Sequence, residues 1–113
     1  MDLEEYFETG PDFERPIFEV ICGHMQSIDP DIWFEPVSVG IFFKRRSRFL
    51  ALRTMTRWIA VSFSLNRKLE SGRLARKVVA HGKRYFHVVN VPTAEAIDDQ
   101  LLEWLAEAWH DDQ

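Results

Sequence analysis

The spacing of apolar residues changes twice along the chain, and this change constrains the fold more than any other feature. Between Phe13 and Ile28 apolar residues recur every three or four positions, which predicts an amphipathic helix with one buried stripe. Between Trp33 and Leu65 the period falls to two, which is typical of strands that bury one face, and a polar loop at 66–73 separates this part from two further strands between Lys77 and Val91. The helical spacing returns after Asp98, which is placed to cap a final helix.

Alternating apolar residues in the middle of the chain predict about five mostly antiparallel strands. The expected strands cover residues 37–44, 49–55, 58–65, 77–81 and 84–91. A first helix capped by Asp12 and a last helix capped by Asp98 each carry one apolar stripe and can pack on the same face of this sheet. The predicted fold is a two-layer α+β sandwich that forms a single domain over residues 1–113, a length that suits one core.

The last two expected strands are joined by the Gly-Lys pair at 82–83, which suits a two-residue hairpin loop. This loop pairs Ala80 with Tyr85, and alternation then places His87 on the core face and His81 on the opposite face. The two histidines are therefore not expected to ligate one metal ion. His87 is expected to be either a buried, hydrogen-bonded residue or the floor of a pocket.

Charges separate by position along the chain, although the net charge is only −4. Residues 1–35 carry −9, residues 36–90 carry +12, and residues 91–113 carry −7. One interpretation is that acidic and basic elements pack side by side and form exposed ion pairs, each adding about 0 to 1 kcal/mol. The other is one basic face for a polyanion and one acidic face for a cation or a basic partner, because clustered charge concentrates ligands of opposite sign.

The sheet face opposite the helices is expected to mix aromatic and basic side chains. Such a face can bind an unidentified protein or small molecule, or serve as a homo-oligomer contact, since interfaces favour aromatic residues and arginine. It also has the two features that single-stranded nucleic acid needs, rings for base stacking and cations for phosphates. The expected surface residues are Phe42, Lys44, Arg53, Trp58, Lys77, His81, Arg84 and Phe86.

Catalysis is disfavoured, because the common hydrolase, zinc protease, nucleotide and dinucleotide motifs are all absent. We therefore predict no catalytic residue, no cofactor and no metal site. The lone cysteine, Cys22, cannot form an internal disulfide, which suits a reducing compartment. The start of the chain is acidic and no apolar run approaches the length of a membrane span, so we expect a cytoplasmic protein without a membrane partner.

The segment from Phe86 to Val91, the run from Ile97 to Leu105 and the closing Ala108-Trp109 resemble a family of uncharacterised bacterial domains, the 5655 family of domains of unknown function. His87 matches the histidine of that family's last strand, Asp98 the acid that opens its final helix, and Trp104 its W-L-x-x-A motif. The resemblance implies no chemical role for these residues.

A more distant similarity in layout is to YdhG-like and frataxin-like proteins, the latter being iron chaperones that use an acidic first helix. This similarity implies, as an alternative function, weak binding of iron or another divalent ion on acidic helices. The acids concerned are Asp12, Glu14 and Glu19, which the helical spacing does not bring to one face.

Overall fold

In the computed structural model, which describes residues 1–113, the first apolar stripe forms α2 (Glu14–Ile28). Ile17, Ile21 and Met25 are fully buried along it, as the spacing predicts. The expected cap is wrong, because Phe13 holds the N-cap position and no side chain caps this helix. A short helix, α1 (Leu3–Phe7), precedes it, and the Asp2 carboxylate accepts a hydrogen bond from its Glu5 N–H at 2.8 Å.

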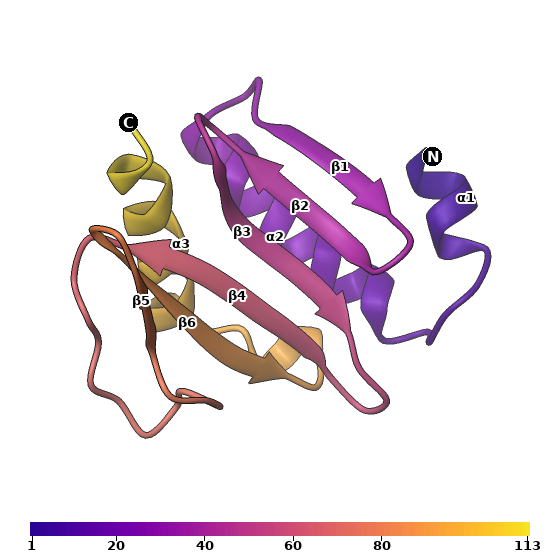
Figure 1. Ribbon diagram of the computed structural model, residues 1–113. Helices are drawn as coiled ribbons and strands as arrows, with labels where there is room; N and C mark the ends of the chain where they lie inside the picture. The colour runs from indigo at the N-terminus through magenta and orange to yellow at the C-terminus, as the bar shows by residue number, and fades with distance from the viewer.

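The second apolar stripe forms α3 (Asp99–Asp111), which follows a single turn of 3-10 helix, η1 (Ala94–Ala96). Its predicted cap is confirmed, because the Asp98 carboxylate accepts a hydrogen bond from the Leu101 N–H at 3.0 Å. Figure 1 shows α2 and α3 together behind the sheet, while α1 lies beside β1. The predicted α+β fold, with helices on one face of a mostly antiparallel sheet, is therefore confirmed.

The sheet has six strands, all paired antiparallel, in the order β1-β2-β3-β4-β6-β5. Successive strands are neighbours except at the last position, where β6 pairs with β4 and leaves β5 at the edge. The strands are β1 (Trp33–Val37), β2 (Gly40–Lys44), β3 (Arg48–Thr54), β4 (Ile59–Leu65), β5 (Val79–His81) and β6 (Arg84–Val91).

The strand expected over residues 37–44 is wrong, because the chain turns back at Ser38 and Val39 and forms a hairpin of β1 and β2. Ser38 is the only residue of this two-residue turn that is common in turns, so the alternating pattern continues across the turn without a strong break signal. Gly40 follows the turn with φ +155° and lies so close to the Leu52 carbonyl of β3 that no Cβ fits there. A sixth strand results.

The β5–β6 hairpin has the predicted register, with Ala80 opposite Tyr85 and His81 opposite Arg84. Gly82 adopts φ +62° in the loop, a backbone conformation that favours glycine. The 66–78 loop that leads into β5 runs beside β6, because the Ala75 N–H donates to the Val88 carbonyl at 2.7 Å. This contact holds the loop against the outer part of the sheet.

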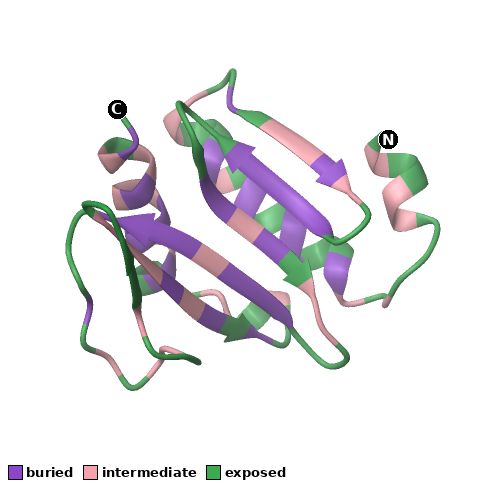
Figure 2. Ribbon diagram, viewed as in Figure 1, coloured by how far each residue is buried: buried purple, intermediate pink, exposed green.

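One face of the sheet and the inner faces of α2 and α3 form the core (Figure 2). The inward side chains of the central strands are almost completely buried, including Phe43, Leu50, Phe63 and Val89. The opposite face carries no helix (Figure 1). No helix is both long and apolar enough to cross a membrane.

The acidic and basic parts of the chain meet in ion pairs. Four of the five ion pairs in the structure join the basic middle of the chain to its acidic ends, as the first interpretation of the charge pattern expects. These four are Arg48–Glu35, Arg67–Glu107, Arg73–Asp98 and Arg84–Asp112.

Candidate functional site

The open sheet face brings three of the predicted surface residues together. Phe42 of β2, Arg53 of β3 and Phe86 of β6 line one hollow of about 160 Å³. Their strands place them on one face because Phe42 pairs with Ala51, and Ala51 with Ser62. The floor between them is therefore built of small residues, which gives the hollow its depth.

Arg48 completes this hollow, although it is not among the predicted surface residues. A β-bulge next to Phe43 shifts the register so that Lys44 pairs with Arg48 rather than with Phe49. Simple counting from the core residue Leu50 would place Arg48 on the core face, whereas the bulge moves it to the open face. A bulge has no clear sequence signal here, so alternation alone could not have found this residue.

Two arginines cover the ring of Phe42. The guanidinium carbon of Arg48 lies 4.3 Å from the ring centroid and that of Arg53 lies 5.8 Å away, both within the range of cation–π attraction. Phe42 is consequently buried, so it does not offer a free ring for stacking. Its role in the structure is to hold the two guanidinium groups beside the hollow.

A second hollow of about 210 Å³ adjoins the first and shares Arg53 and Ser62 with it. Arg76 lines this second hollow together with Val88, beside which the loop is held by the Ala75 hydrogen bond. We call the two hollows, with Arg48, Arg53 and Arg76, the arginine hollows. No aspartate or glutamate lines either of them.

Most of the charge in the arginine hollows is not neutralised by the protein. Arg53 and Arg76 form no ion pair. Arg48 approaches Glu35 at 3.7 Å, which is long, and both side chains are about half exposed. The hollows therefore combine cationic walls with a floor of Ala51, Ala60 and Ser62, an arrangement that attracts anions.

The structure places other predicted surface residues away from the arginine hollows. Lys44 lies 5.7 Å from the ring of Trp33 at the β1 side of the sheet, and His81 packs edge-on against Phe86 in the β5 hairpin. Trp58 lies in the turn between β3 and β4 and is 38% exposed, and Lys77 is an exposed loop residue before β5. The predicted surface is thus spread over several parts of the open face.

Arg84 has a structural role that the sequence did not indicate. Its guanidinium donates to the Asp112 carboxylate at 2.7 Å and to the Ser64 hydroxyl at 3.0 Å. Asp112 is fully buried and also accepts hydrogen bonds from Arg46 and Ser47 in the β2–β3 turn. Burial alone raises the pKa of Asp112, but these hydrogen bonds outweigh it and lower the pKa below its usual value.

The acids considered for divalent ions do not gather. Glu14 is buried, Glu19 forms an exposed ion pair with Arg15, and Asp12 is exposed. No group of three or more histidine, cysteine, aspartate or glutamate side chains is arranged to hold a metal ion. Nothing in this geometry favours the frataxin-like alternative.

The sequence model of a family described as Domain of unknown function (DUF5655) matches residues 3–112. The chain belongs to this family. Among curated proteins and among solved structures no match was found. The DUF5655 description assigns no activity, so the function of this DUF5655 chain has to be argued from its sites. The expected distant likeness to frataxin-like proteins stays a prediction.

His87, which matches the histidine of the DUF5655 resemblance, lies in the core and not in a pocket. It is fully buried, its ring stacks on Phe63 at 5.3 Å, and its Nε2 accepts a hydrogen bond from the Leu69 N–H at 3.0 Å. Its Nδ1 has no hydrogen-bond partner. Burial lowers the pKa of His87, and nearby backbone carbonyls of Phe63 and Tyr85 offset only part of this effect.

The other two residues of the DUF5655 resemblance also have structural roles. Trp104 is buried and stacks on Phe63 at 6.0 Å, which extends the stack that His87 begins. Asp98 caps α3 and accepts hydrogen bonds from Arg73 at 2.8 Å. The bond from the Leu101 N–H, followed by the bond from Arg73, lowers the pKa of Asp98.

Proposed function

We propose that the protein is a binding domain whose arginine hollows hold a small phosphate-bearing anion. The observation that supports this most is the convergence of Arg48, Arg53 and Arg76 on two adjoining hollows that contain no carboxylate. Arginine is well suited to this task because its planar guanidinium can donate two parallel hydrogen bonds to one phosphate group.

The number of arginines favours a phosphate monoester over a carboxylate. A phosphate monoester carries a charge of about −1.5 to −2 at pH 7, whereas a carboxylate carries only one charge. Phe86 is half buried at the rim of the first hollow and offers an apolar wall for the rest of the ligand. A nucleoside monophosphate combines these two features and serves as the first probe.

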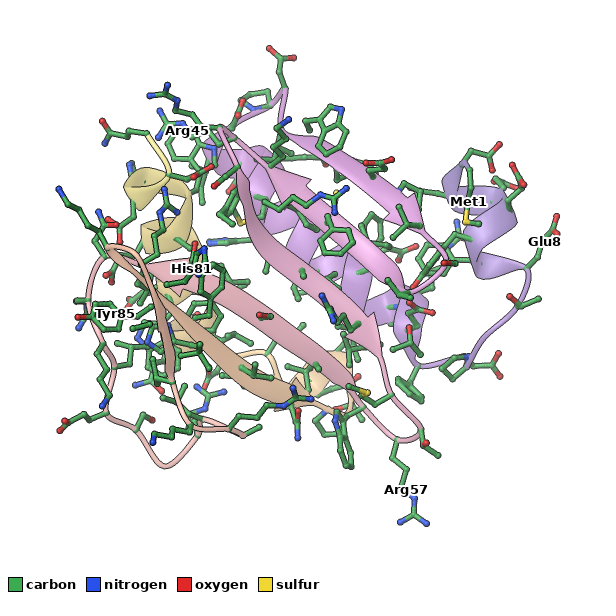
Figure 3. All side chains as sticks on the ribbon, in the orientation of Figure 1. Met1, Glu8, Arg45, Arg57, His81 and Tyr85 are labelled. Carbon is green, nitrogen blue, oxygen red and sulfur yellow. The ribbon has the colours of Figure 1, made fainter.

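Calorimetric titration with adenosine monophosphate and with inorganic phosphate tests this proposal. We expect saturable binding that Arg53→Gln weakens about tenfold or more, because Arg53 lines both hollows and a charge-assisted hydrogen bond contributes about 1.5 to 3 kcal/mol. Arg57→Gln is the matched control, since it removes the same charge from a side chain that extends away from the sheet (Figure 3). Equal weakening by both variants, or no saturable binding, would contradict the proposal.

Single-stranded nucleic acid is the second candidate ligand. The exposed ring of Trp58 favours it, because this ring is free for base stacking at the end of β3, in the same turn as Arg57. Nine of the fourteen lysines and arginines form no ion pair. The covered ring of Phe42 argues for the smaller anion as the first choice.

The proposed location is the cytoplasm. Cys22 is the only cysteine and is buried and free, which suits a reducing compartment.

A homo-oligomer contact and an unidentified protein partner remain alternatives for the open sheet face. Sedimentation of the protein with and without ligand separates them from small-anion binding.

A further inference from the structure

A hollow of opposite chemistry lies on the helix side of the sheet, where α1, the loop before α2, the β1–β2 turn and the end of β3 meet. Its volume is about 300 Å³. Two carboxylates and four hydroxyl groups line it, and no lysine, arginine or histidine does. These side chains belong to Glu5, Tyr6, Thr9, Glu14, Ser38 and Thr54, and we call the hollow the Glu14 pocket. Met1 also lines this pocket, and its amino group forms no ion pair with either carboxylate.

Glu14 is the unusual group of this pocket, because its side chain is charged yet the residue is only 5% exposed. No basic side chain pairs with it. Its Oε2 accepts hydrogen bonds from the Tyr6 hydroxyl and from the Thr54 hydroxyl, the latter at 2.6 Å. Burial of a carboxylate with hydroxyl partners alone leaves most of its charge without compensation.

The other oxygen of Glu14 has no partner. No donor in the chain reaches Oε1, and this atom is not sealed in the core like the unpaired Nδ1 of His87. Gly10 lies in front of it with φ +99°, and a Cβ at that position would come within 3.3 Å of Oε1. Glycine at this position therefore keeps the space next to Oε1 clear.

The Tyr6 hydroxyl helps to determine which carboxylate oxygen of Glu14 is free to bind a ligand. Burial, together with the hydrogen bond to Glu14, raises the pKa of Tyr6 to about 12, so its hydroxyl stays protonated and donates to Oε2. With Oε2 occupied by two donors, only Oε1 remains for a ligand in the pocket.

We propose that the Glu14 pocket binds a primary ammonium group, with Oε1 of Glu14 as its charged acceptor. An ammonium group offers three N–H donors on one compact charge, and the hydroxyl oxygens of Thr9 and Ser38 line the same pocket as further acceptors. A guanidinium fits less well, because its fork favours two free oxygens of one carboxylate and Oε2 is already occupied. A divalent ion fits less well, because calcium favours several carboxylate ligands and no group of three or more acidic, histidine or cysteine side chains is arranged to hold a metal ion.

The ammonium group can come from a free small amine or from a lysine side chain of another protein. n-Butylamine, which is charged at neutral pH, represents the free amine, and N-acetyl-lysine methylamide represents a lysine within a peptide. n-Butanol has nearly the same size and no charge. Tighter binding of the lysine compound than of n-butylamine assigns the pocket to a lysine side chain, and the reverse assigns it to free amines.

The test is an NMR titration of the amide signals of Thr9 and Gly10 with each probe, up to about 50 mM, which exceeds the millimolar range expected for so small a ligand. We expect saturable shifts with n-butylamine and none with n-butanol. Glu14→Gln should weaken binding about tenfold or more, because it removes the charged acceptor and keeps the shape of the side chain. Glu4→Gln is the matched control, since Glu4 is an exposed acid of α1 that does not line the pocket.

Two further measurements keep the test decisive if Glu14→Gln does not fold. The comparison of n-butylamine with n-butanol needs only the unaltered protein, and Ser38→Ala at an exposed turn should weaken binding a few fold. Equal shifts with the amine and the alcohol, no saturation, or equal binding by Glu14→Gln and the unaltered protein would each overturn the proposal. Arg53→Gln should leave these shifts unchanged, so failure of the arginine hollows and failure of this pocket are distinguishable.

Discussion

Burial makes His87 a residue whose protonation is linked to folding. Its ring is fully enclosed, and one nitrogen accepts the Leu69 N–H while the other has no partner. A positive charge on this ring would lose its hydration without gaining an acid partner, so the folded state holds it neutral. The imidazole can regain a proton fully only when the core opens.

We predict that the free energy of unfolding falls as the pH is lowered below about 6.5, the ordinary pKa of histidine. The sign follows from the lowered pKa, because the unfolded state binds the proton first and gains stability relative to the folded state. Urea unfolding between pH 7.5 and 5, chosen to lie above the range of carboxylates, measures this effect. His87→Gln should be less stable but lack the decline, and a decline of equal size in that variant would contradict the assignment.

We predict that replacement of glycine by alanine changes the stability of the protein in opposite directions at Gly40 and Gly23. Gly40→Ala should destabilise the protein by about 3 kcal/mol or more, because the added Cβ would collide with the Leu52 carbonyl of the neighbouring strand. Gly23→Ala should stabilise it by about 0.5 to 1 kcal/mol, since Gly23 lies inside α2 with open space where a Cβ would go. Thermal unfolding of both variants checks this, and a similar sign for both would contradict it.

Among the secondary-structure elements, α3 has one fully buried carboxylate, that of Asp112, at its C-terminal end, where Arg45 and Asn66 also donate hydrogen bonds to Trp109 and Asp111. Asp112 accepts hydrogen bonds from Arg46, Ser47 and Arg84, and thereby ties the helix end to the β2–β3 turn and to β6. All of these partners are distant in sequence. The C-terminal end of α3 is therefore anchored by tertiary contacts that cannot be inferred from the sequence of the helix itself.

We predict that Asp112→Ala lowers the free energy of unfolding by about 3 kcal/mol, because it leaves the turn N–H groups and the Arg84 guanidinium without their acceptor. Glu103→Gln, at an exposed position in the same helix, should change stability by less than about 0.5 kcal/mol. Urea unfolding at neutral pH measures both. Equal effects of the two substitutions would show that the buried carboxylate does not anchor α3.

The elements that local signals specify could be predicted from the sequence, and those that depend on distant contacts could not. Asp98 as a cap and the register of the β5–β6 hairpin follow from residues within a few positions of one another. The β1–β2 turn has Ser38 as its only turn signal, and the bulge that exposes Arg48 arises from pairing between strands. Arg84 was predicted on the open face, but Asp112 engages it from 28 positions away.

Over the whole molecule, the fold sorts charge by layer. Most acids of the first and last parts of the chain belong to α1, α2, α3 and the segments that flank them, and Glu35 of β1 is the one acid of these parts in a strand. The unpaired bases belong to the sheet and its loops. Figure 1 shows the two long helices on one face of the sheet, and most residues that line the arginine hollows belong to the opposite face. An anionic ligand on the open face therefore meets the basic layer first, although the protein as a whole is negatively charged.

This arrangement predicts how salt affects any binding of single-stranded nucleic acid. If Arg48, Arg53 and Arg76 neutralise three phosphates, the logarithm of the association constant should fall with the logarithm of salt concentration with a slope of about −2. Trp58→Ala should weaken binding about fivefold or more and leave the slope unchanged, because stacking releases no counterions. Fluorescence titration of a short labelled strand measures both quantities, and a steeper slope with no effect of Trp58→Ala would indicate nonspecific attraction.

The two edges of the sheet are both short of free hydrogen-bonding groups. At one edge, Pro36 removes one N–H from β1, and α1 packs beside this strand. At the other edge, β5 has only three residues, and beyond it the Ala75 N–H donates to the Val88 carbonyl of β6. A second copy of the chain therefore finds no long strand to extend. Self-association would have to use the open face of the sheet. An anion held in the arginine hollows, as we propose, would compete with a second copy for this face, so rising ligand concentration should drive any such dimer apart.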